Sequence, residues 1–108
     1  MELLDIKKDH RGEIFKFKSG SKTILLSFTK KGWFRGGDIH NMTQYIFLLD
    51  GGVEVITQLT RDGPEEHTLY KDKQIIQIPV GVPHLFHFLE DSITLDLQDE
   101  TMTTEYFD

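Results

Sequence analysis

The segment from Arg35 to Gly51 reads RGGDIHNMTQYIFLLDG and is the most informative part of the chain about its fold. It places Asp38 and His40 two residues apart, adds Gln44 four residues further on, and ends in an apolar run before a turn. Successive side chains of an extended strand point to opposite faces, so Asp38 and His40 share a face that Gln44 continues if the register holds. This layout predicts a small barrel with a polar cluster at its mouth and a packed floor.

Length and composition bound the class of protein. A chain of 108 residues accommodates one domain over 1–108, in which 99–108 forms an acidic tail. The chain has no cysteine, so disulfides, thiolate zinc sites and thiol nucleophiles are excluded. We find no secretory-signal pattern and no run approaching the roughly 18 apolar residues that span a bilayer, and therefore expect a soluble cytoplasmic protein without a membrane partner.

The distribution of charge along the chain indicates which classes of ligand the protein can bind. The formal net charge is -6, which argues against nucleic-acid binding because phosphate-backbone affinity comes from clustered Lys and Arg. Residues 99–108 hold four acidic residues and no base, which leaves only -2 for the body of the domain. An anionic small molecule is therefore compatible with the body.

The rest of the chain reads as short strands separated by turns. We find no sustained helical spacing, and turn signals recur about every ten residues, which predicts an all-β sandwich or barrel. We expect Ile93, Leu95 and Leu97 to face inward in the last strand. The expected strands cover residues 13–18, 23–29, 38–48, 53–60, 67–70, 74–79, 84–89 and 92–97.

Two apolar segments bear on assembly. Residues 45–49 are apolar on both faces, as is much of 23–28, whereas a lone antiparallel barrel of this size should present a polar outer face to water. Either these strands lie under loops in the middle of a sandwich, or their outer faces pack on a second subunit. We favour a homodimer.

Two motifs carry a resemblance to the cupins. Cupins have His-x-His, then Glu, then Gly six residues later, and a second motif of Pro-x-Gly, two residues and His. Here Asp38 stands at the first histidine, His40 at the second and Gln44 at the glutamate, while 79–84 (PVGVPH) fits the second motif with His84 as its final ligand. The whole chain thus resembles a small single-domain cupin, which implies a jelly-roll barrel, also called a double-stranded β-helix.

Within the cupins, the chain is similar to the RmlC-like branch of deoxysugar epimerases and nucleotide-sugar 3,4-ketoisomerases. The shared features are Asp-x-Arg-Gly at 9–12, Arg35-Gly36 before the histidine strand, and Ile-Pro-x-Gly-x-x-His-x-Phe at 78–86. The ketoisomerases carry two histidines where Asp38 and His40 stand. The resemblance implies isomerase or epimerase chemistry on a nucleotide-activated sugar, in carbohydrate biosynthesis.

That chemistry needs a base beside a carbonyl, and a histidine near neutral pKa is suited to the task. Our candidate base is His40, with His84 or a tyrosine returning the proton. The fork geometry of Arg35 suits a diphosphate, although a surface arginine beside a glycine turn is an equally good interpretation. Phe86 shares a face with His84 and is expected to form the pocket wall.

Two alternatives remain open. In the first, Asp38, His40, Gln44 and His84 bind a divalent metal (Fe, Mn, Ni or Zn), since two histidines and a carboxylate resemble the set used by non-haem iron oxygenases. In the second, the protein is a non-catalytic sugar-binding or sensor cupin. Near the mouth of the barrel, Asp38, His40 and Gln44 would then form a hydrogen-bonded polar cluster without an ion.

Overall fold

The structure is a computed structural model that describes the backbone of residues 1–58, 60, 62–99 and 104–106, and the side chains of 1–36, 41–58, 60 and 62–98. Among the described residues, no helix has the length and apolar character needed to cross a membrane. The strands are β1 (Glu2–Asp9), β2 (Gly12–Ser19), β3 (Lys22–Thr29), β4 (Phe34–His40), β5 (Gln44–Asp50), β6 (Gly52–Gln58), β7 (Glu65–Lys71), β8 (Gln74–Ile78), β9 (His84–Phe88), β10 (Ser92–Asp99) and β11 (Thr104–Tyr106).

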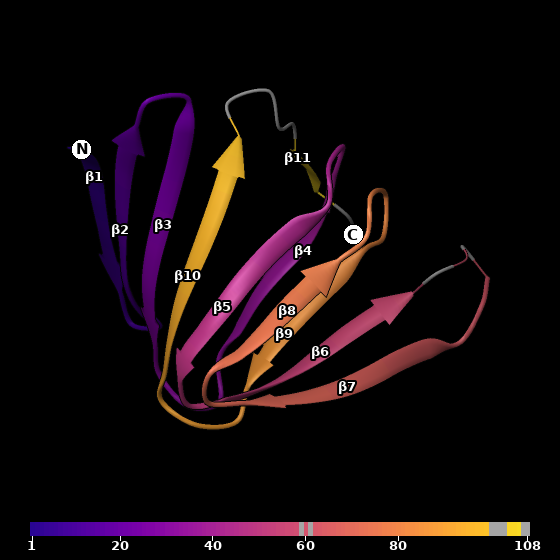
Figure 1. Cartoon of the computed structure of the whole chain (residues 1–108). Helices are drawn as coiled ribbons and strands as arrows, with labels where there is room; N and C mark the ends of the chain where they lie inside the picture. The colour runs from indigo at the N-terminus through magenta and orange to yellow at the C-terminus, as the bar shows by residue number, and fades with distance from the viewer. Residues whose placement is uncertain (59, 61, 100–103, 107–108) are drawn as a thin grey trace.

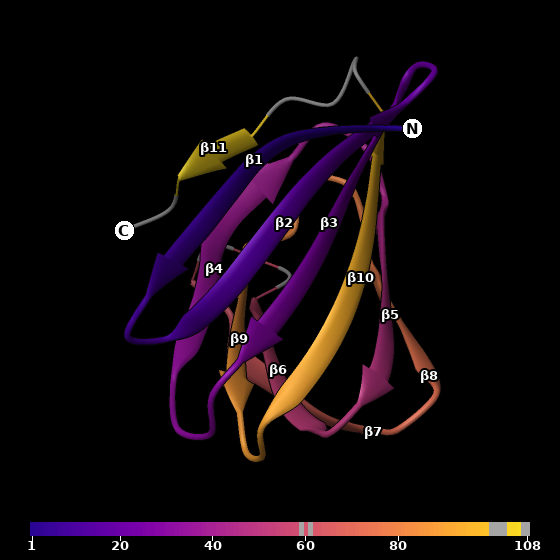
Figure 2. The same cartoon turned by 90° about the vertical axis from the view of Figure 1, so that its left-hand side faces the viewer.

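Two antiparallel sheets face each other in the described chain. One has the strand order β1-β2-β3-β10-β5-β8 and the other has the order β11-β4-β9-β6-β7. Figure 1 shows the strands fanning out side by side, and the turned view in Figure 2 shows β1, β2, β3 and β10 in front of β4, β9 and β6. The predicted all-β, jelly-roll class is confirmed.

Several strand predictions need correction. Residues 35–51 do not form one strand, because the chain turns at 41–43 and passes from β4 in one sheet to β5 in the other. The polar segment Glu2–Asp9, which we did not expect to be a strand, pairs with β2 as the edge strand β1. Within the expected acidic tail, Thr104–Tyr106 forms β11 and pairs with β4.

The apolar core occupies one half of the space between the sheets. Its members come from β5, β6, β8, β9 and the turn before β9. The most deeply buried are Leu48, Val53 and Ile76, each with no exposed side-chain surface. This half of the barrel is the packed floor that the sequence predicts.

The other half of the interior is polar. On β3 and β10 the inward positions hold Ser27, Thr29, Thr94 and Asp96, all buried. The prediction that Ile93, Leu95 and Leu97 face inward is therefore wrong, and Leu97 is 52% exposed. Strand alternation defines two faces without saying which of them is inside. Here the polar face lies inside, and it forms the wall of a cavity.

The core makes a direct stability prediction. Val53→Ala should lower the free energy of unfolding by about 2 to 3 kcal/mol, because it removes buried methyl groups and leaves a cavity that neighbours fill only in part. Val80, which is 57% exposed in the turn after β8, provides the matched control. Val80→Ala should change the same quantity by less than about 0.5 kcal/mol in urea titrations. Equal effects would contradict this placement of the core.

Candidate functional site

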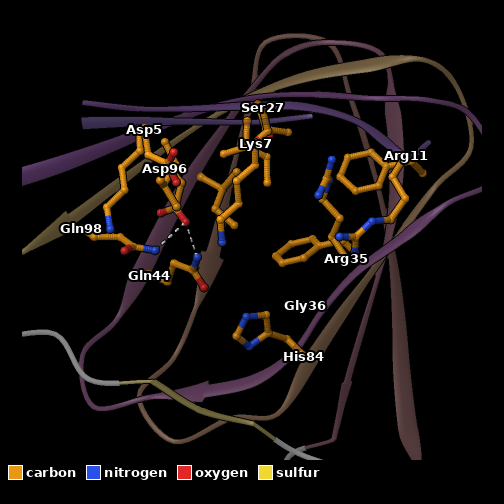
Figure 3. Close-up of a pocket in the computed structure, with 17 residues that line it drawn as sticks. Asp5, Lys7, Arg11, Ser27, Arg35, Gly36, Gln44, His84, Asp96 and Gln98 are labelled. Carbon is orange, nitrogen blue, oxygen red and sulfur yellow. Dashed lines mark hydrogen bonds between the residues drawn. The ribbon is translucent and has the colours of Figure 1, made fainter. Parts of the chain in front are cut away.

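The polar half contains a cavity of about 570 Å³ between the two sheets. It receives side chains from β1, β2, β3, β10 and β5 of one sheet and from β4 and β9 of the other. A volume of this size falls within the range of small-molecule sites. Figure 3 shows Gln44, Asp96 and Gln98 on one side of the view and Arg11 and Arg35 on the other, with Lys7 between these two groups.

The first group is cationic and contains Arg11 and Arg35. Arg11 follows β1, and Asp9 holds it by side-chain hydrogen bonds of 2.9 Å to Nη2 and 3.2 Å to Nε and by a 2.8 Å bond to its backbone N–H. The bonds to Arg11 lower the pKa of Asp9 to about 2. Asp9 therefore stays charged and keeps the guanidinium in place, which gives the Asp-x-Arg-Gly segment a physical role.

Arg35 enters the cavity from the first half of β4. Its Nε donates a 2.7 Å hydrogen bond to Oγ1 of Thr29, which is buried on β3. Partial burial, followed by repulsion from Arg11, lowers the pKa of Arg35 from its usual value. Two guanidinium groups that repel each other at a cavity wall favour an anion between them.

The second group lies on β5 and β10, where Gln44, Asp96 and Gln98 meet. The Nε2 atoms of Gln44 and Gln98 both donate to Oδ2 of Asp96, at 2.6 Å and 3.1 Å. Gln44 and Asp96 are only 4% and 9% exposed. Because a carboxylate accepts and does not donate, these bonds fix the orientation of both amides.

His84 lines the same cavity from the start of β9, where it is 3% exposed. Its Nδ1 lies 3.1 Å from the carbonyl oxygen of Val82. A carbonyl only accepts, so this bond assigns a hydrogen to Nδ1. Phe86, two residues on, meets the His84 ring edge-on at 5.3 Å and forms part of the cavity wall.

Gly36 lets β4 approach β9 closely at this point. Its φ is 102°, and a Cβ placed there would lie 3.1 Å from the carbonyl oxygen of His84 and 3.2 Å from Cδ2 of Phe86. A larger residue would thus be strained by its backbone conformation and would also press on the wall of the cavity.

Of the predicted site residues, the structure brings Arg35, Gln44, His84 and Phe86 to one cavity. The side chains of Asp38 and His40 lie outside the described residues. Their backbone belongs to β4, which pairs with β9 so that Asp38 is the partner of His84. The predicted adjacency of the two motifs, forty-four positions apart between His40 and His84, is thus confirmed for the backbone.

The proposed metal site receives only partial support from the described part of the chain. Within it, no group of three or more His, Cys, Asp or Glu side chains is arranged to hold a metal ion. Gln44 and His84 would supply a neutral oxygen and an imidazole nitrogen. Both are donors that divalent metals accept, but they make two ligands and not a full set.

Sequence reasoning missed several cavity residues, among them Arg11 and Asp96. Arg11 was seen only as part of a turn motif, and Asp96 was placed on the outer face of the last strand. The available signal for Asp96 was a charged residue in the centre of an otherwise alternating apolar strand, where a carboxylate needs a specific reason to be.

Neither a protein-family model nor a curated protein sequence matches the chain. Solved structures do. The capsular polysaccharide assembling protein CapF from Staphylococcus aureus matches 99% of this chain and 29% of its own, with a TM-score of 0.72 and 18% identity. A variant of the oxalate decarboxylase of Bacillus subtilis matches 95% of this chain and 30% of its own, with a TM-score of 0.80 and 14% identity.

The chain spans about a third of the length of these solved proteins, and the low identity limits the comparison to the fold. Both neighbours are cupins. Together with the two facing antiparallel sheets and the two motifs brought together on β4, β5 and β9, the likeness covers nearly the whole chain. The protein therefore has the fold of a small cupin, a jelly-roll barrel with a polar cavity in one half of its interior.

Proposed function

We propose that the cavity binds a nucleotide-activated sugar and that the protein isomerises or epimerises it. The observation that carries this proposal is the division of one cavity into a cationic side, with Arg11 and Arg35, and a carboxylate–amide side, with His84 also on the wall. A diphosphate suits the arginines, and a hydroxylated ring suits the opposite side. CapF is a capsular polysaccharide assembling protein, which agrees with a ligand of the sugar class.

The reaction requires one proton to leave a carbon next to a carbonyl group and one to return. We assign the removal to His40 on β4 and the return to His84. The hydrogen bond from His84 Nδ1 to the Val82 carbonyl keeps the imidazole in a single orientation. With the hydrogen on Nδ1, Nε2 can hold the proton that is transferred and release it to carbon.

Proton exchange with solvent provides the test. The protein is incubated with a keto sugar nucleotide in D2O. Deuterium should then appear at the sugar carbon beside the carbonyl group, and NMR measures the rate of this exchange. His40→Ala and His84→Gln should each slow the exchange by about 100-fold or more. His87 on the same strand, stacked on Phe34 at 4.2 Å on the opposite face, is the matched control, and His87→Gln should leave the rate unchanged.

Two results would redirect the assignment. Unchanged exchange in His40→Ala would remove that residue as the base. Ligands that raise the melting temperature without any deuterium incorporation would support a sugar-binding or sensor protein instead of an enzyme.

A divalent metal is the second candidate, favoured by one feature of His84. Metal-bound histidines commonly donate their other ring N–H to a carbonyl or carboxylate, as Nδ1 of His84 does to Val82. Elemental analysis after purification without chelator should then find Fe, Mn, Ni or Zn at one equivalent per chain. That equivalent should fall in His84→Gln and stay in His87→Gln, and a metal-free native protein would exclude this candidate.

A further inference from the structure

The carboxylate–amide side of the cavity has a buried acceptor that no group in the described part of the chain satisfies. Because Nε2 of Gln44 is held by Asp96, the amide oxygen Oε1 is directed elsewhere, and it is buried without a hydrogen-bond partner. Leaving a buried acceptor unsatisfied costs about 1 to 3 kcal/mol. Such groups are rare in native proteins, and they call for a specific partner.

The chemistry of this side selects the kind of partner. An acceptor beside a buried carboxylate calls for a hydrogen donor, and the amide groups of Gln44 and Gln98 offer donors at the same place. A hydroxyl group both donates and accepts a hydrogen bond. Neighbouring sugar hydroxyls therefore match the donors and acceptors that these side chains present together. A phosphate would meet the Asp96 carboxylate and suffer repulsion.

We propose that Asp96, with Gln44 and Gln98, forms a hydroxyl-recognition subsite. It determines which end of the ligand binds at the carboxylate–amide side of the cavity. This inference rests on the proposed function and deepens it. The arginines hold the diphosphate, and the Asp96 subsite reads ring hydroxyls. The ligand therefore lies across the cavity in a single direction.

Two kinds of probe separate this role from a general loss of binding. Calorimetric titrations would compare UDP-glucose, dTDP-glucose and GDP-mannose with the matching nucleoside diphosphates. Asp96→Asn should weaken binding of the sugar nucleotides at least ten-fold and change binding of the nucleoside diphosphates less than two-fold. Gln44→Met, which removes the acceptor without adding charge, should show the same selectivity, and thermal melts would establish that both variants are folded.

The outcomes distinguish the two proposals. If the native protein binds the sugar nucleotides and both variants bind them equally well, the subsite is wrong while the proposed ligand class stands. If the variants lose both kinds of probe in proportion, the three side chains support the cavity as a whole and the subsite is again wrong. If the native protein binds neither kind of probe, both proposals fail.

A second inference comes from an independent feature, the outer face of the six-stranded sheet. The strand registers align one residue from each strand in a single row, and all six are large and apolar. From edge to edge the row contains Ile6, Phe15, Leu26, Leu95, Phe47 and Ile75. The neighbouring row contains Leu3, Phe17, Ile24, Leu97, Tyr45 and Gln77, so five of its six members are apolar.

These two rows remain accessible. The exposed fractions are 50% for Ile6, 59% for Ile75, 52% for Leu97 and 51% for Tyr45. Neighbouring strands are about 4.8 Å apart, and residues on the same face of one strand are about 6.6 Å apart. With these spacings, the two rows and the apolar residues of the adjacent row cover roughly 450 Å² of the flat sheet, without the extra surface of protruding side chains. The largest apolar patch of a typical monomer covers about 300 to 600 Å² and is often functional.

We infer that this face packs on the same face of a second copy of the chain. Stable dimers bury about 800 Å² on each partner, and the apolar patch of roughly 450 Å² supplies about half of that area, with the polar rim around it as the remainder. A twisted sheet packs best on a sheet of matching twist and width, with apolar side chains interdigitating between them. A two-fold related copy provides that match by symmetry.

Light scattering with size-exclusion chromatography tests this assembly. The native protein should be a dimer at micromolar concentration. The double variant Tyr45→Glu, Leu97→Glu, on paired exposed positions, should be a folded monomer by circular dichroism. Leu69→Glu, on the 62% exposed position of β7 in the other sheet, should remain a dimer. A monomeric native protein, or a double variant that is still a dimer, would overturn the inference.

Discussion

Replacing Gly12 by alanine is expected to destabilise the protein by more than about 4 kcal/mol and to leave much of it unfolded. Gly12 has a φ of 138° at the turn between β1 and β2, and a Cβ there would lie 1.8 Å from the carbonyl oxygen of Phe28. The neighbouring atom is backbone, so it cannot move aside without displacing β3. The same turn accepts a 2.8 Å hydrogen bond from Lys30 N–H at Arg11.

Gly20 provides the matched control for this experiment. Its φ is 60°, in the left-handed region, but a Cβ there would meet nothing within 4 Å. Gly20→Ala should therefore cost only about 1 kcal/mol, the penalty of the backbone conformation alone. Urea titrations measure both variants. If Gly12→Ala costs no more than Gly20→Ala, β2 does not approach β3 as closely as described.

Replacing Arg35 by alanine is expected to weaken binding of a nucleoside diphosphate by about 100-fold, a value typical of a charge-assisted, partly buried contact. Arg35→Lys should recover only part of this affinity, because an ammonium group lacks the planar fork that matches phosphate oxygens. Lys71→Ala on β7 removes one positive charge from an exposed position and is the control for net charge.

The stability of the Arg35 variants separates binding from folding. Burial and Arg11 both disfavour the charged form of Arg35, as its lowered pKa records. Removing the side chain should therefore leave the free energy of unfolding close to that of the native protein, despite the loss of its hydrogen bond to Thr29. A large fall in stability together with unchanged affinity would assign Arg35 a structural role.

The sequence predicts the fold because its two motifs resemble those of the cupins in order and spacing. That resemblance places the segment of His40 beside the segment of His84, and the register pairs β4 with β9, while β5, which carries Gln44, lies in the facing sheet. Alternation in 84–88 also predicts correctly that His84, Phe86 and Phe88 share the buried face, while His87 faces the other way.

The parts that the sequence does not predict concern which face of a strand is inside. On β10, Ile93, Leu95 and Leu97 outweigh Thr94 and Asp96 in hydrophobicity, so burial of the apolar face is the natural expectation. The cavity reverses the usual preference, because the buried residues that β3 and β10 present to it are polar. Strand β1 is not predicted because all of its residues are exposed at the edge of the sheet. An edge strand of this kind does not need the alternation of apolar and polar residues by which strands are recognised in a sequence.

A crystal structure with a bound nucleotide sugar would show whether one cavity holds a diphosphate on the arginine side and a sugar on the Asp96 side. We expect phosphate oxygens about 3 Å from the guanidinium groups of Arg11 and Arg35, with ring hydroxyls on Gln44 and Asp96 and His84 beside the ring. A ligand bound outside the barrel, or a diphosphate on the Asp96 side, would rule out this binding mode.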